Sequence, residues 1–111
     1  MKPKLKVWVV FRDGVKLGDG RAHLLELIDE LGSIQKAVGR LGMSYRSAWG
    51  YLRELEDAAG FQFLERKQGA GPRSGTRLTR RGKAFLGRYW RFRTRLDKAV
   101  AGAFKRSFDR E

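Results

Sequence analysis

Three side chains that can form hydrogen bonds follow one another at the start of a helical pattern. Tyr45, Arg46 and Ser47 come directly after Ser44, a residue type that caps helices by accepting a hydrogen bond from a nearby backbone N–H. A guanidinium group can bind guanine through two hydrogen bonds, which discriminates against other bases by about 1–3 kcal/mol. These residues are equally compatible with an ordinary solvated first turn. They are not expected in the core, because the inward stripe of this helix is Ala48, Trp49, Leu52, Leu55 and Ala59.

Two short helices are expected to meet at this point. Ser33 can cap the first helix, Gly42 permits the left-handed turn that ends it, and the second helix runs from Ser44 to Gly60. Two helices joined by a short turn containing glycine predict a helix-turn-helix, whose second helix presents its N-terminal residues to base edges in the major groove. The expected inner face of the first helix is Ile34, Ala37, Val38 and Leu41.

The chain before this motif predicts a hairpin and a helix. Residues 4–12 and 15–18 are expected to be strands, because the pair Asp13-Gly14 between apolar runs is a strong hairpin signal. Asp19 is the expected N-cap of the following helix, and Gly32 its stop. Its apolar stripe is Leu24, Leu25, Leu27, Ile28 and Leu31.

The chain after the motif predicts a second hairpin. Residues 61–67 alternate and then become basic, 68–75 are rich in glycine, and 76–78 resume an extended pattern. A hairpin directly after a recognition helix is typical of the wing of a winged helix, and Arg73 at its tip is expected to approach a phosphate backbone or a minor groove. A phosphate-binding P-loop is excluded here, because both the glycine spacing and the essential lysine are missing.

A long helix is expected from Arg80, capped by Thr79, almost to the C-terminus. Its apolar residues recur at alternating steps of three and four, and a helix of about 30 residues is roughly 45 Å long. Pairing with a second copy of the chain would bury this seam, whereas the alternative is that the helix folds back over its own core. The expected dimer contacts are Phe85, Tyr89, Phe92, Leu96, Val100 and Phe104, with Phe108 extending them. Trp8 and Trp90 are interpreted as packing residues.

Charge and composition limit the function further. The chain has 25 Lys and Arg against 12 Asp and Glu, a net charge of +13, and eleven basic residues with no acidic one lie between Arg66 and Leu96. Nucleic acid is the partner that such a field favours, with an anionic membrane as the rival. Cysteine is absent, His23 stands alone beside an apolar run, and no acid–base, nucleophile or metal-ligand constellation is visible. No enzyme activity, metal or cofactor is therefore expected, and neither a leader nor a membrane span is expected, so the chain is predicted to be cytoplasmic.

The sharpest motifs are "GSI" (32–34), "GMSYRSAW" (42–49), "ERKQGAG" (65–71) and "LTRRGKAFL" (78–86). They resemble the N-terminal domain of ModE-type molybdate-responsive transcription regulators and, more distantly, LysR-type domains. The resemblance covers about residues 5–100 and implies a winged helix-turn-helix that dimerises through flanking helices. Because the sequence ends at Glu111, no oxyanion-binding domain is expected, and molybdate sensing is not carried over. The wing also departs from the family, which usually has nearly unbroken glycine there.

The sequence therefore predicts an α+β, mostly α, fold with an N-terminal hairpin, a wing and a long C-terminal helix. Residues 1–78 form the DNA-binding part and 79–111 the dimerisation helix of one continuous domain. The predicted function is a homodimeric, sequence-specific regulator of transcription on double-stranded DNA, and the alternative is a sequence-indifferent architectural protein. A separate effector-sensing partner stays open. The expected DNA contacts are Ser33, Ser44, Tyr45, Arg46, Ser47, Tyr51, Lys67, Arg73, Ser74, Arg77, Arg80 and Arg81.

Overall fold

The two N-terminal strands are much shorter than the sequence predicts. In the computed structural model, which describes residues 1–68 and 75–108, β1 is Val9–Val10 and β2 is Lys16–Leu17, paired antiparallel around the short turn η1 (Arg12–Gly14). Residues 1–8 have no strand partner. They run beside the last long helix instead, where Arg93 donates a hydrogen bond to the carbonyl oxygen of Leu5 at 3.2 Å.

Three helices follow the hairpin: α1 (Asp19–Leu31), α2 (Ile34–Leu41) and α3 (Tyr45–Ala59). The caps of α2 and α3 are confirmed, because Ser33 Oγ accepts from Lys36 N at 3.1 Å and Ser44 Oγ accepts from Ser47 N at 3.3 Å. Gly42 ends α2 with φ 68°, a left-handed conformation that places the start of α3 close to the end of α2. α1 and α3 also end at the predicted glycines, Gly32 and Gly60.

The sequence suggested Asp19 as the N-cap of α1, but the structure shows otherwise. Gly18 occupies that position without a side-chain cap, and Asp19 is the first residue of the helix. Its carboxylate accepts hydrogen bonds from Tyr89 and from Arg93 of the last helix. Asp19 therefore fixes a tertiary contact rather than a helix end, which a local sequence pattern does not reveal.

The wing forms as predicted, with β3 (Leu64–Lys67) paired antiparallel to β4 (Gly75–Leu78). Leu64 pairs with Leu78, and Lys67 pairs with Gly75. β4 is joined to the end of α1, because Thr76 N donates to the carbonyl oxygen of Gly32 at 3.0 Å. Gly75 has φ +94°, and a Cβ at this position would overlap that same oxygen. Only glycine allows this approach without a rearrangement.

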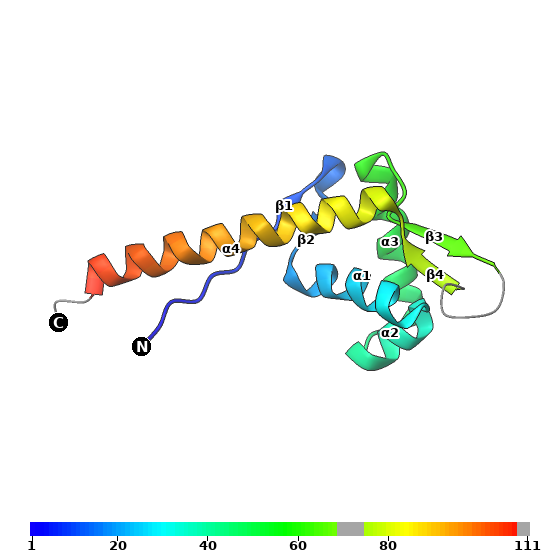
Figure 1. Cartoon of the computed structure of the whole chain (residues 1–111), viewed down its shortest axis with the longest axis horizontal. Helices are drawn as coiled ribbons and strands as arrows, with labels where there is room; N and C mark the ends of the chain where they lie inside the picture. Colours follow the sequence, from blue (N-terminus) through cyan, green and yellow to red (C-terminus); the bar gives the residue numbers. More distant parts are fainter. Residues whose placement is uncertain (69–74, 109–111) are drawn as a thin grey trace.

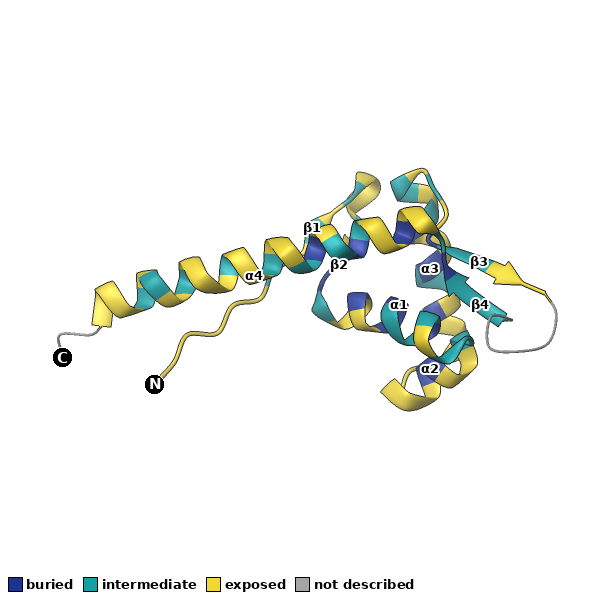
Figure 2. Cartoon of the chain, in the orientation of Figure 1, coloured by how far each residue is buried: buried dark blue, intermediate teal, exposed yellow. Residues whose placement is uncertain are grey.

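The last helix, α4 (Arg80–Phe108), begins at the predicted cap, because Thr79 Oγ1 accepts from Gly82 N at 2.9 Å. Figure 1 shows α4 crossing the body and then projecting past it, so the chain measures 60 × 30 × 26 Å. Its first half is part of the core, with Gly82, Leu86 and Tyr89 buried, whereas the projecting half has no buried residue (Figure 2). The first half of α4 therefore folds back over the chain's own core, as the alternative expectation had it, while pairing of the projecting half with a second copy stays a prediction.

The core lies between α1, α3, the wing and the start of α4. Its largest fully buried side chains are Phe63, Leu17, Leu24, Leu25, Ile28 and Leu55. Phe85 of α4 closes it on one side, with ring centroids 5.4 Å from both Phe11 and Phe63. Two predicted core positions are wrong: Leu41 is 39% exposed and Trp49 is 46% exposed. The buried stripes of α2 and α3 are narrower than the sequence suggested.

The N-terminal hairpin is fixed to α3 by Tyr51. The Tyr51 hydroxyl donates to the carbonyl oxygen of Lys16 at 2.9 Å, and the Arg21 guanidinium lies 4.0 Å from the centre of the Tyr51 ring. Burial raises the pKa of Tyr51 to about 12, although Arg21 acts in the opposite direction. The hydroxyl therefore stays protonated, and keeps its hydrogen bond, well above neutral pH.

Gly75→Ala is expected to destabilise the chain by about 1–3 kcal/mol, because it places a side chain in the left-handed region and against the Gly32 carbonyl oxygen. Gly39→Ala is the matched control. A Cβ at Gly39 meets no atom within 4 Å, and the helix interior should gain about 0.5–1 kcal/mol. Chemical denaturation of both variants checks this pair, and equal stability would contradict the close approach of β4 to α1.

Tyr51→Phe is expected to cost about 1 kcal/mol near pH 8, the usual value of one lost hydrogen bond. Because the folded pKa, about 12, lies above the ordinary value of 10.0, the advantage of tyrosine is complete below pH 10 and disappears as the pH rises through 12. Unfolding midpoints of both proteins between pH 8 and 12 measure this convergence. Tyr45→Phe, at an exposed tyrosine, should change stability by less than about 0.5 kcal/mol. A difference that stays constant with pH would argue against the Lys16 contact.

Candidate nucleic-acid interface

The first turn of α3 is exposed and polar. Tyr45 is 50% exposed, and Arg46 and Ser47 are exposed as well. The cap by Ser44 ties the backbone of this turn, so the three side chains leave a rigid helix end rather than a loop. This is the arrangement that hydrogen bonding to an external polar surface requires.

Trp49 and Arg53 continue the outward surface of α3, and sequence reasoning placed Trp49 wrongly in the core. The Arg53 guanidinium lies 4.8 Å from the centre of the Trp49 ring, so the two side chains form an exposed aromatic–cation pair. Trp49 lies one turn after Tyr45 on the helix. The signal that could have found it is the narrow stripe of Ala48, Leu52 and Leu55, from which Trp49 departs by about 100°.

A groove runs along each side of α3. On one side, the N-terminal hairpin contributes Lys16 and α1 contributes Arg21, facing Arg46, Ser47 and Tyr51. On the other side, Leu64, Glu65 and Arg66 of the wing face Trp49 and Arg53. α3 is therefore flanked by two hairpins, and basic side chains border it on both sides. Lys16 and Arg21 were not among the residues expected at the site.

Several predicted site residues have their polar groups occupied within the chain. The Tyr51 hydroxyl donates to Lys16, and the Arg77 guanidinium donates to the carbonyl oxygen of Asp29 in α1. The Ser33 and Ser44 hydroxyl oxygens accept their capping hydrogen bonds. These four residues thus hold the backbone around α3 and the wing in place through contacts within the chain.

The wing is held by carboxylates from two helices. Glu56 of α3 accepts from Phe63 N at 2.7 Å and from Leu64 N at 3.1 Å, where β3 begins. Asp29 of α1 accepts from Leu78 N at 2.9 Å, where β4 ends. The base of the wing is thus fixed to both α3 and α1. Neither carboxylate was recognised from the sequence.

The remaining predicted wing and α4 contacts differ in placement. Lys67 is exposed and forms an ion pair with Glu65 at 3.3 Å. Arg80 and Arg81 are exposed at the start of α4, and Arg81 lies 4.5 Å from the centre of the Phe61 ring. Arg73 and Ser74 lie outside the described residues.

The six expected dimer contacts fall into two groups. Phe85 packs against the rings of Phe11, Phe61 and Phe63, and Tyr89 is only 3% exposed, because the first half of α4 covers the chain's own core. Burial, together with the Asp19 carboxylate beside the hydroxyl, raises the pKa of Tyr89 above its ordinary range. Tyr89 is therefore unavailable to a partner, which corrects the prediction for that residue, and the half-buried Phe85 packs on the chain's own core. Phe92 is 44% exposed, and Leu96, Val100 and Phe104 lie partly exposed on the projecting half.

The other aromatic residues expected in packing or dimer contacts differ in their surroundings. Phe104 and Phe108 contact one another, with ring centroids 4.9 Å apart. Trp90 packs against Tyr89 and His23 at 5.1 Å each, as a packing residue should. Trp8 instead is half exposed, with the Lys16 ammonium 5.0 Å from its ring centre.

Residues 1–68 and 75–108 contain neither a helix that could span a membrane nor a cluster of metal-binding side chains. No helix in these ranges is apolar over a stretch long enough to span a bilayer. No group of three or more His, Asp or Glu side chains there is arranged to hold a metal ion.

Comparison with known proteins gives consistent relatives. The molybdenum transport protein ModE of Azotobacter vinelandii is 33% identical over 76 residues, which is 68% of this chain and 28% of that protein. The transcriptional regulator ModE of Haemophilus influenzae is 35% identical over 69 residues, 62% of this chain and 27% of that protein. The chain therefore spans less than a third of the length of these curated relatives.

A solved structure supports the fold. The CbnR DBD in a crystal structure of a CbnR DBD–DNA complex aligns with 79% of this chain and 93% of its own, at a TM-score of 0.56 and 25% identity. The family profile described as bacterial regulatory helix-turn-helix protein, lysR family, matches residues 21–83, from the first turn of α1 into α4. The chain belongs to the LysR family of bacterial regulatory helix-turn-helix proteins.

Proposed function

We propose that this chain regulates transcription by binding double-stranded DNA in a sequence-specific manner, as a homodimer. The observation that carries the proposal is the capped and exposed first turn of α3, with Tyr45, Arg46 and Ser47 directed outward. The family is one of regulators rather than enzymes, and the solved relative is a DNA complex. Molybdenum, named for the A. vinelandii relative, is not extended to this chain, which spans 28% of that protein.

In the proposed complex, α3 enters the major groove with its first turn against the base edges. Arg46 donates two hydrogen bonds to guanine, and Tyr45 and Ser47 bind neighbouring bases or phosphates. Trp49 and Arg53 lie deeper along the same helix, where apolar contact with a thymine methyl group and a phosphate contact are available to them. This assigns specificity to the first turn and affinity to the surrounding cations.

Flanking elements supply contacts to the phosphate backbone. Lys67, Arg73 and Ser74 of the wing and Arg80 and Arg81 at the start of α4 are the proposed contacts on the wing side. Ser33 and Ser44 contribute through the backbone N–H groups at the helix starts that they cap, where anions bind favourably. Tyr51 and Arg77 are left out of the proposed contacts, because they hold the hairpin and the wing in place.

The projecting half of α4 is the proposed dimer interface. Phe92, Leu96, Val100 and Phe104 form one apolar side of a helix that has left its own core. Burial against the same surface of a second chain removes that side from water and is self-complementary under a two-fold axis. Two recognition helices related in this way fit half-sites about one helical turn apart, roughly 34 Å.

The net charge of +13 favours a second candidate, a sequence-indifferent architectural protein. Selection of binding sites from random duplexes at physiological salt separates the two functions. Recovery of a two-fold consensus supports the regulator. Recovery of all sequences equally supports the architectural protein.

Arg46→Ala is expected to relax the base preference at one position in each half-site, lowering discrimination by about 1–3 kcal/mol. Repeating the selection with the variant measures this directly. Arg40→Ala, an equal charge change at the exposed end of α2, is the matched control and should leave every preference intact. A uniform loss over all sequences would instead identify Arg46 as a phosphate contact.

Leu96→Glu combined with Val100→Glu is expected to convert the dimer to a monomer, because it places two charges in the proposed apolar interface. Thr94→Glu combined with Lys98→Glu is the control, since each position lies two residues earlier and therefore about 200° around the helix. Sedimentation equilibrium of the two variants and the parent chain gives the association state. A parent chain that is already monomeric at tens of micromolar would contradict the proposed dimer.

A further inference from the structure

The outer face of α4 carries basic side chains along its whole length and no acidic one. Arg88, Arg91 and Arg95 each come two residues after a side chain that points inward, namely Leu86, Tyr89 and Arg93. Two helical steps rotate the direction by about 200°, so these arginines face away from the core. The same face continues in both directions. Its basic members, called the α4 stripe below, are Arg80, Arg81, Arg88, Arg91, Arg95, Lys98, Lys105 and Arg106, all of them exposed.

The stripe is not neutralised by the chain itself. Within residues 1–68 and 75–108, none of its eight cations forms an ion pair, whereas Arg93, on the inner face, binds both Asp19 and Asp97. Like charges three or four residues apart on a helix destabilise it. Arg88, Arg91, Arg95 and Lys98 have this spacing, so the face lacks the mixed charges of an ordinary solvated surface.

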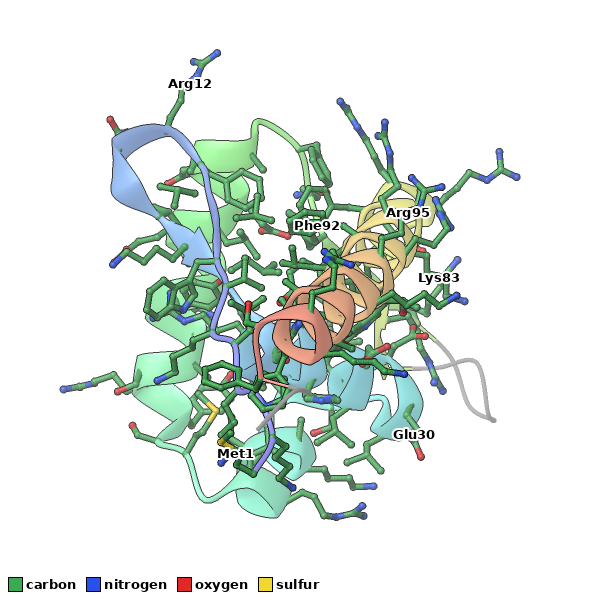
Figure 3. The ribbon with its side chains drawn as sticks, turned by 90° about the vertical axis from the view of Figure 1, so that its left-hand side faces the viewer. Met1, Arg12, Glu30, Lys83, Phe92 and Arg95 are labelled. Atoms are coloured by element: carbon green, nitrogen blue, oxygen red, sulfur yellow. The ribbon has the colours of Figure 1, made fainter. Side chains whose placement is uncertain are left out.

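The stripe and the recognition surface lie on different sides of the molecule. Figure 3 looks along α4, with α3 on one side of the body and with Lys83 and Arg95 on the side of α4 remote from α3. Core side chains, among them Phe63 and Phe85, lie between these two helices. A straight duplex bound at the first turn of α3 reaches Arg80 and Arg81 at the start of α4, but it cannot also lie along the rest of the stripe, from Arg88 to Arg106. The proposed dimer contacts, Leu96 and Val100, leave the stripe uncovered, because they belong to another face of α4.

The chemistry of the stripe fits a phosphate backbone better than a protein surface. Six of its eight members are arginine, whose planar group binds phosphate through two hydrogen bonds. The positions between them are small or polar, as at Ala84, Gly87, Thr94 and Gly102. Trp90 lies half-buried at the edge of this face, beside Arg91, Arg95 and Lys98, but no large apolar residue stands among the arginines to form the centre of a protein interface. From Arg80 to Arg106 the stripe is about 39 Å long, which is roughly the length of 11 base pairs.

We infer that the α4 stripe binds the phosphate backbone of a second DNA duplex, without regard to sequence, while α3 binds the first. The inference adds to the proposed function a capacity to bring two DNA segments together. It rests on that function only for the first duplex. The stripe needs no base contact, so its binding weakens steeply as salt is added.

A capture experiment with two duplexes tests this. Beads carry one random-sequence duplex of about 30 base pairs, the protein is bound and washed, and a fluorescent duplex of the same composition is then added. The quadruple variant Arg88→Gln, Arg91→Gln, Arg95→Gln and Lys98→Gln is expected to stay on the beads within about threefold of the parent level. Its capture of the fluorescent duplex is expected to fall at least tenfold.

The control removes the same number of charges elsewhere, through Lys2→Gln, Lys4→Gln, Lys6→Gln and Arg12→Gln, all at exposed residues. It should capture the second duplex within twofold of the parent. Thermal unfolding followed by circular dichroism shows whether each variant is folded, and Arg91→Gln with Arg95→Gln serves as the milder pair if the quadruple variant is not.

Several outcomes overturn the inference and leave the proposed function standing. Capture that survives the α4 substitutions assigns bridging to the two recognition helices of a dimer. Loss of binding to the first duplex in the same proportion places the stripe on the DNA that α3 contacts. Stripe-dependent binding to phosphatidylserine vesicles without capture of a duplex assigns the stripe to a membrane surface. A parent chain that binds neither these beads nor any duplex in the selection of binding sites contradicts the proposed function itself.

Discussion

The surface around α3 depends most directly on the two hydrogen bonds that the Glu56 carboxylate accepts. Glu56 lies on α3, the helix that carries the candidate reading residues, and its carboxylate accepts hydrogen bonds from the backbone N–H groups of Phe63 and Leu64, where the wing begins. Hydrogen bonds to a charged group contribute about 1.5–3 kcal/mol each. Because both bonds reach the backbone, they fix the direction of β3 relative to α3. The wing and the recognition helix therefore act as one rigid unit.

Two other carboxylates play equivalent parts. Asp29 at the end of α1 binds the backbone of β4, and Asp19 at the start of α1 binds Tyr89 and Arg93 of α4. These acidic groups thus serve the interior of a chain that has only 12 of them. The outer face of α4 is left to basic residues, so part of the charge of +13 is concentrated there, whereas Asp13, Glu54 and Glu65 lie among the cations in the grooves beside α3.

Local signals in the sequence were sufficient for the helices, and tertiary contacts explain what they missed. The caps Ser33, Ser44 and Thr79 act within three residues of themselves, so their roles could be predicted from the chain alone. Asp19 is of a residue type that often caps helices, but its carboxylate binds Tyr89 and Arg93, which are 70 and 74 positions away in the sequence. Trp49 was predicted to lie in the core because it is apolar. The buried stripe of α3 consists of Ala48, Leu52 and Leu55, and Trp49 lies outside it.

The candidate site could be predicted in its centre and less well at its edges. Tyr45, Arg46 and Ser47 were expected to be exposed, because the inward stripe of α3 passes them by, and they are. Arg77 was expected to contact DNA, but its guanidinium donates to the carbonyl oxygen of Asp29 in α1. Whether a cation on a strand turns inward depends on which acceptors other elements bring near it. A single sequence does not state this.

α4 carries a core-facing side, an apolar side and a basic stripe, and Arg93 helps to set how all three are oriented relative to the body of the chain. Arg93 lies near the middle of the helix, and its contacts with Asp19 and with Leu5 fix the rotation of α4 about its own axis. A shift of one residue in that contact would turn the helix by about 100°. The apolar side at Leu96 and Val100 and the basic stripe at Arg95 and Lys98 would turn with it, since a straight helix carries all its faces together. The inner contact thus determines which way the apolar side and the basic stripe face, even though Arg93 itself belongs to neither surface.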